Sequence, residues 1–229
     1  MNRSLLAASW FAVRRPGLWL PAAAALVLAS ATVPVLDDGH AIQVLRGAGL
    51  LLACAWCAAT DDPSGEVAAA SPYPRHIRFL ARAVAAATVV LPIWGLAAVL
   101  AEARAEPTPT WGLGLEAAAL CLAGLAIGAG LRAWTGHLSP SYLTVIGVVT
   151  LAVLTNALPR EWAMVQPQTW GPPWEAAQLR WAGLLLVGAG MLALALRDPV
   201  RLPGPRTPAS VGKPTAAWLG DARRHAARD

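Results

Sequence analysis

The chain has 229 residues, of which 56% are hydrophobic and 14% charged, and its formal net charge is +5 at pH 7. An ordinary soluble domain carries about 25% charged residues. The apolar residues form six blocks of roughly 20 residues, the length at which a helix crosses a hydrocarbon layer about 30 Å thick. These blocks use most of the chain, which excludes a soluble catalytic domain and predicts an all-α, polytopic membrane protein with six transmembrane helices.

In chain order, the spans are predicted near residues 17–36, 41–60, 80–101, 113–134, 142–158 and 179–197. Residues 1–16 precede them as an N-terminal interfacial helix, because Leu6, Trp10 and Val13 share one helix face. The sequence therefore divides into this helix, a six-span domain over 17–200 and a Pro-rich basic cytoplasmic tail over 201–229.

An alternative for the N-terminus is a signal peptide ending at Ala29-Ser30-Ala31. The apolar run before this site has the full length of a span, which favours a retained helix over a cleaved one.

The basic residues set the predicted orientation. With a cytoplasmic N-terminus, fourteen Lys and Arg residues fall on the inner segments and three, Arg104, Arg160 and Arg180, on the outer ones. Arg46 lies within the second span, near its outer start, where Asp37 or Asp38 can neutralise it. The positive-inside rule then places both termini in the cytoplasm. The basic excess thus indicates topology rather than nucleic-acid binding, and the Arg- and Ala-rich composition suggests a bacterial inner membrane protein.

The cytoplasmic loop between the second and third spans contains a predicted short helix near residues 63–71. Asp62 is a suitable N-cap, and Pro63 suits the first helical position. Glu66 lies in the first turn, where its charge complements the helix dipole. Pro72 cannot continue the helix. The loop is interpreted either as a lipid anchor or as a docking helix for a cytoplasmic partner.

The outer segment over residues 159–178 is too apolar for a solvated loop and, with Pro172 and Pro173, too broken for a span. Its tryptophans favour the membrane interface. It is predicted to be an interfacial segment, or a re-entrant one where protein covers its backbone.

The cytoplasmic loop also carries a family resemblance. Its pattern is a Gly and an acidic residue, a short apolar helix, a Pro, and basic residues leading into the third span. The residues are Ser64-Gly65-Glu66-Val67, Ala70-Ser71-Pro72, Arg75 and Leu80-Ala81-Arg82. This pattern and the six-span plan resemble the membrane permeases of ABC type-2 exporters.

The resemblance implies a permease that binds no cofactor of its own, with ATP and Mg²⁺ held by separate cytoplasmic ABC ATPase subunits. The chain contains no GxxxxGK[ST] phosphate loop. The 63–71 helix would be the coupling helix, and a second permease copy or a paralogue would complete the membrane part. The residues implied in coupling are Asp62, Gly65, Glu66, Val67, Pro72, Arg75 and Arg78. The alternative function is a non-transporting membrane anchor or scaffold that recruits a cytoplasmic partner through the same loop.

Polar and small residues inside the spans are candidates for a pathway or for helix packing. Those of the fifth span are Thr144, Thr150, Thr155 and Asn156, and the fourth span carries Gly124 and Gly128 in a GxxxG spacing. Pro92 is expected to kink the third span, because it has no N–H to donate to the preceding turn.

Cys54-Ala55-Trp56-Cys57 is a CxxC motif, but it lies inside an apolar helix. Redox CxxC motifs need a helix N-terminus and access to a partner thiol. Small structural residues are therefore favoured over a redox pair, and a metal site lacks further ligands nearby.

Overall fold

The computed structural model describes residues 19–27, 38–58, 74–102, 109–135, 141–166 and 170–197. Within these ranges every regular element is a helix, which confirms the all-α prediction. Residues 19–27 are helical, and they are followed by α3 (Asp38–Ala58), α4 (Arg75–Glu102), α5 (Thr110–Thr135) and α6 (Ser141–Ala157). A short 3-10 helix, η2 (Arg160–Trp162), precedes α7 (Pro172–Leu196).

Four of the described helices are long and apolar enough to cross a membrane. They are His40–Ala58 of α3, His76–Glu102 of α4, Thr110–Trp134 of α5 and Pro172–Leu196 of α7. α6 is apolar as well but has only 17 residues. These lengths and compositions fit a membrane-embedded protein. The first predicted span is described only over 19–27, so the six-span count stays a prediction.

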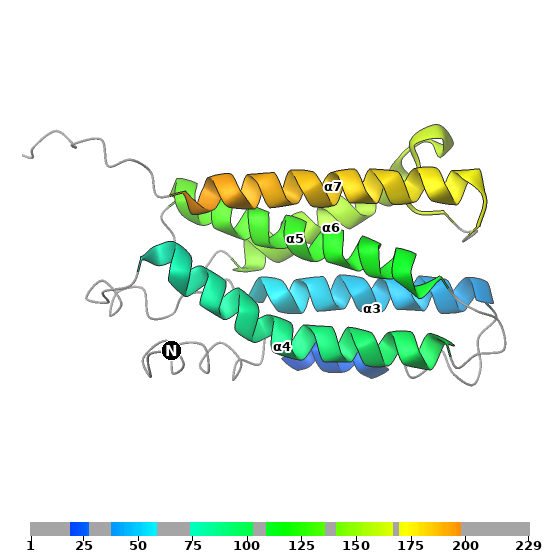
Figure 1. Cartoon of the computed structure of the whole chain (residues 1–229), viewed down its shortest axis with the longest axis horizontal. Coiled ribbons are helices and arrows are strands. Elements are labelled where there is room, and N and C mark those ends of the chain that lie inside the picture. Colours follow the sequence, from blue (N-terminus) through cyan, green and yellow to red (C-terminus); the bar gives the residue numbers. More distant parts are fainter. Residues whose placement is uncertain are drawn as a thin grey trace, which may run out of the picture. The chain divides into compact units, whose positions relative to one another are not determined.

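α5 is the central helix of the described bundle. Figure 1 shows α5 lying between α3 and α7, and it also contacts α4 and α6. In the most apolar 18-residue stretch of α5, 72% of the residues are buried, compared with 28% for the same length of α4 and 11% for that of α7. The outward faces of α4, α6 and α7 carry large apolar side chains, such as Val84, Val153 and Leu186. An apolar outer surface of this kind suits contact with lipid.

Close helix contact at Gly124 confirms one part of the predicted glycine packing. A Cβ atom at this position would lie 2.5 Å from Cys57 Sγ of α3 and 2.9 Å from Val148 Cγ2 of α6. Only a residue without a side chain permits this approach. Gly128 is also buried in α5.

α4 begins at Arg75, directly after Pro74, and is 28 residues long with Pro92 inside it. Figure 1 shows that α4 is bent along its length, as the missing N–H of Pro92 leads us to expect. The basic residues Arg78 and Arg82 belong to its first turns, and Arg82 is 4% exposed.

The prediction for the start of the last span is wrong by seven residues. α7 begins at Pro172, whereas the prolines at 172 and 173 were expected to interrupt a helix. Proline is tolerated in the first turn, because the N–H it lacks has no helical partner there. Gly171 precedes the helix with a φ of 81°, a conformation that glycine adopts readily. The part of the predicted outer segment from Pro172 onward therefore belongs to α7.

Candidate functional site

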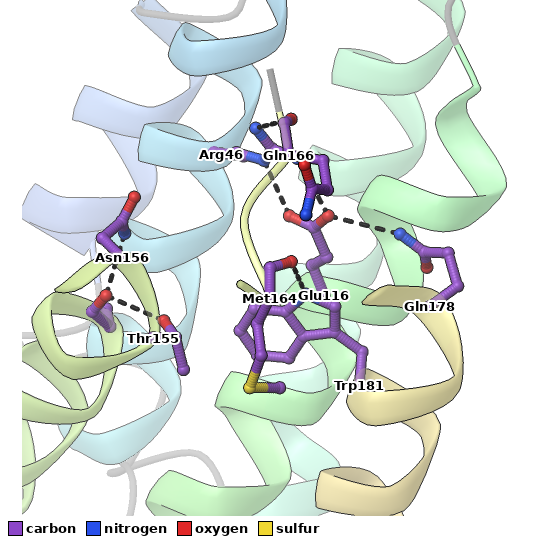
Figure 2. Close-up of polar contacts among 9 residues, drawn as sticks. Arg46, Glu116, Thr155, Asn156, Met164, Gln166, Gln178 and Trp181 are labelled. Atoms are coloured by element: carbon purple, nitrogen blue, oxygen red, sulfur yellow. Dashed lines mark hydrogen bonds and ion pairs between the residues drawn. The ribbon is translucent and has the colours of Figure 1, made fainter. Parts of the chain in front are cut away.

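A charged pair lies inside the bundle of apolar helices, between α3 and α5 (Figure 2). Arg46 Nε donates to Glu116 Oε2 at 2.8 Å, and Arg46 Nη2 donates to Glu116 Oε1 at 3.1 Å. The two side chains are only 10% and 6% exposed. Two parallel charge-assisted hydrogen bonds fix both the distance and the orientation of the two helices at this point.

Two further groups form hydrogen bonds to this pair. Arg46 Nη1 donates to the carbonyl oxygen of Gln166 at 2.8 Å, and Gln178 Nε2 of α7 donates to Glu116 Oε1 at 3.3 Å. The pair, from α3 and α5, is thus bonded further to α7 and to the segment after η2. Isolated charges are costly in an apolar interior, so these bonds are what makes their burial tolerable.

The segment over residues 160–166 is held by side chains of the neighbouring helices. Arg180 Nη2 and Nη1 donate to the carbonyl oxygens of Glu161 and Ala163, both at 2.8 Å. Trp181 Nε1 donates to the carbonyl oxygen of Met164, also at 2.8 Å. With the Arg46–Gln166 bond, four carbonyls of this irregular segment receive donors from α3 and α7. These bonds satisfy backbone groups that a re-entrant segment would need to have covered by protein, and whether the segment enters the membrane stays a prediction.

A cavity of about 190 Å³ lies beside the pair, between α3, α5, α6 and the segment 160–166. Its polar lining comes from Gln43, Arg46, Glu116, Thr155 and Asn156, and Leu50, Leu113, Leu120, Val165 and Trp181 are among its apolar lining. Thr155 Oγ1 and Asn156 Nδ2 both donate to the carbonyl oxygen of Ala152, at 2.8 and 2.9 Å. These bonds stay within α6 and orient the two side chains at the end of that helix (Figure 2).

The four predicted polar residues of α6 therefore do not form one lining. Thr155 and Asn156 line the cavity, whereas Thr144 is buried at another point of the helix and Thr150 is exposed. The packing interpretation requires hydrogen bonds to a neighbouring helix. The bonds of Thr155 and Asn156 described above instead end on Ala152 of their own helix.

The residues implied in coupling are mostly outside the described part of the chain. This holds for Asp62, Gly65, Glu66, Val67 and Pro72. Of the other two, Arg75 starts α4 and Arg78 is half-buried in its first turn.

The cysteines give no support to a redox site. All three are thiols, and Cys57 and Cys121 are buried in a cluster with Val148 and Trp181. Among the described residues, no group of three or more His, Cys, Asp and Glu side chains is placed to hold a metal ion.

Sequence reasoning missed Glu116 and assigned Arg46 to the wrong partner. The structure pairs Arg46 with Glu116 of α5, whereas the expectation from chain proximity was Asp37 or Asp38. A usable pattern was present. Arg46 is the one charged residue of the predicted span 41–60, Glu116 is the one acidic residue of the predicted span 113–134, and they lie eight and six residues after the first residue of their helices. In the predicted topology the second and fourth spans run in the same direction, from the outer to the inner side. Similar positions along the two helices would therefore have placed both charges at a similar depth. Gln178 was missed because it fell in the segment expected to be a loop.

The fold and this site define an all-helical protein with a polar, charge-containing cavity inside a bundle of apolar helices. No protein-family model, no curated protein and no solved structure matches the chain.

Proposed function

We propose that this chain is the permease subunit of an ATP-driven exporter of the ABC type-2 kind. It has six spans in a bacterial inner membrane with both termini in the cytoplasm, and it pairs with a second permease copy or a paralogue. ATP and Mg²⁺ are bound by a separate cytoplasmic ATPase, which docks on residues 61–75. ATPase closure acts through this loop and opens a path for the substrate.

The observation that carries the proposal is the Arg46–Glu116 pair beside a cavity in an apolar bundle. Ionisable side chains within membrane spans are costly and mark substrate or ion pathways in many transporters. A protein that only anchors a partner has no need of a buried charge pair or of a cavity next to it. The bent helix α4, which leads from the coupling loop into the bundle, is a suitable element for transmitting movement.

Purification from native membranes in a mild detergent tests this proposal. The expected result is stoichiometric recovery of an ATPase that contains a GxxxxGK[ST] phosphate loop and hydrolyses ATP. A stoichiometric partner without a phosphate loop would instead support the anchor or scaffold function. Full transport activity of this chain alone in liposomes would refute the need for an ATPase.

A further inference from the structure

The cavity beside the Arg46–Glu116 pair offers hydrogen-bonding groups of both kinds. Three of the five N–H groups of Arg46 are used by Glu116 and Gln166, which leaves two as donors. Asn156 uses one N–H on Ala152 and keeps its carbonyl oxygen as an acceptor, while the Thr155 hydroxyl oxygen can also accept. The side chains of Arg46 and Glu116 are already fixed by each other, so the cavity is preorganised for a ligand.

The charge of the lining selects against ions. Among the described residues that line the cavity, Arg46 contributes one positive charge and Glu116 one negative charge. Each is already neutralised by the other at 2.8 Å. The cavity opens to the surface at Gln43 and Asn156, which are exposed, but next to the buried pair an ionic ligand would bring a charge with no counterpart, which is unfavourable. An uncharged ligand with hydroxyl or amide groups meets no such cost.

The volume limits the size of the ligand. A cavity of about 190 Å³ corresponds to about six water molecules at about 30 Å³ each, or to a molecule slightly larger than benzene. The apolar lining from Leu50, Leu113 and Trp181 provides contact for the carbon skeleton of such a molecule.

We propose that this cavity is a binding site for a small uncharged polar molecule of the polyol or amide class. Arg46 donates to its oxygen atoms, and Asn156 and Thr155 accept from its hydroxyl or amide hydrogens. This site does not depend on the ATPase, so the inference goes beyond the proposed function and is tested on the isolated chain.

Saturation-transfer NMR on the purified chain in deuterated-lipid nanodiscs tests the site with three matched probes. Glycerol is uncharged, 3-aminopropane-1,2-diol is a cation and glycerate is an anion at pH 7, and all have the same carbon skeleton. Glycerol is expected to give a signal that exceeds those of both ions by about fivefold or more, since an unpaired charge is costly in this cavity. Two results would overturn the proposal. One is a signal for either ion equal to that of glycerol, and the other is a glycerol signal no stronger than with empty nanodiscs.

Two substitutions at Asn156 locate the binding. Asn156→Leu keeps the side-chain size and removes its polar atoms, so the glycerol signal should fall by about fivefold, the effect of one lost hydrogen bond. Thr150→Val on the exposed part of the same helix is the control and should stay within about twofold of the wild type. Asn156→Asp adds one negative charge and should shift the preference to the cationic probe. An unchanged glycerol signal in Asn156→Leu, or no shift in Asn156→Asp, would contradict the assignment to this cavity.

Discussion

Arg46 and Glu116 each depend on the other for a partner in the interior of the bundle. Their two hydrogen bonds join α3 to α5, and Gln178 joins α7 to the same carboxylate. A buried pair of this kind contributes little relative to apolar residues of the same size, but the removal of one partner leaves an uncompensated charge. The pair therefore fixes the arrangement of α3, α5 and α7 without adding much stability, and the function of the cavity beside it stays a proposal.

Removal of one charge should cost far more than removal of both. Glu116→Leu should lower the free energy of unfolding by about 3–5 kcal/mol, because Arg46 is left charged and buried. The double variant Arg46→Leu/Glu116→Leu should recover at least half of this loss. Unfolding by SDS in mixed micelles measures both values. Glu161→Gln, at an exposed carboxylate, is the control, and a double variant as unstable as Glu116→Leu would contradict the account.

Gly124 and Gly130 of α5 should respond to alanine with opposite signs. A Cβ at Gly124 meets Cys57 and Val148, so Gly124→Ala should destabilise by about 1–3 kcal/mol. A Cβ at Gly130 meets no atom within 4 Å. Gly130→Ala should therefore stabilise by about 0.4–1 kcal/mol through the lower entropy of the unfolded chain. The same SDS titration measures both, and a stabilising Gly124→Ala would show that the helices are not in close contact there.

At the scale of elements, the segment 160–166 is positioned by donors from α3 and α7 in addition to the short 3-10 helix η2 at its start. The sequence predicted an apolar, Trp-containing connection and required protein cover if it entered the membrane. It did not predict which donors provide that cover, because Arg180 was counted only among the basic residues of the outer side and Trp181 was placed in the last span with no partner. Side-chain bonds to backbone carbonyls of distant residues have no sequence pattern of their own.

Loss of these donors should loosen the segment without unfolding the bundle. Arg180→Met removes two bonds to the carbonyls of Glu161 and Ala163. One charged hydrogen bond contributes about 1.5–3 kcal/mol, so amide hydrogen exchange over 160–166 should accelerate about tenfold or more. Arg197→Met, at the exposed end of α7, is the control and should leave this exchange unchanged. Equal exchange in Arg180→Met and the wild type would show that the bonds do not hold the segment.

At the scale of the whole molecule, apolar block length predicted the helices well. The predicted spans at 41–60, 80–101, 113–134 and 142–158 correspond to α3, α4, α5 and α6 with ends shifted by a few residues. The length of an apolar block can be counted along the chain, so the helices that such blocks form can be predicted from the sequence. The Arg46–Glu116 contact joins residues 70 positions apart, and it depends on which helices are neighbours, which hydropathy does not report.

The predicted orientation can be tested with reporters active only in the cytoplasm. A reporter fused after Asp229 should be active, and one inserted between α4 and α5 should be silent, because the basic residues favour the inner side. The reverse pattern in a fusion of equal expression would refute cytoplasmic termini.

The measurement that tests the permease proposal most directly is ATPase docking in Glu66→Gln. If Glu66 pairs with a basic group of the ATPase, loss of this charged contact should cost about 2–5 kcal/mol of docking, so co-purified ATPase and substrate-stimulated ATP hydrolysis should fall together by at least about tenfold. Membrane insertion should stay normal, and Glu161→Gln, whose exposed carboxylate lies in the segment after α6, should change neither quantity. Unchanged docking and turnover in Glu66→Gln, with the same values in Glu161→Gln, would contradict the coupling role assigned to Glu66.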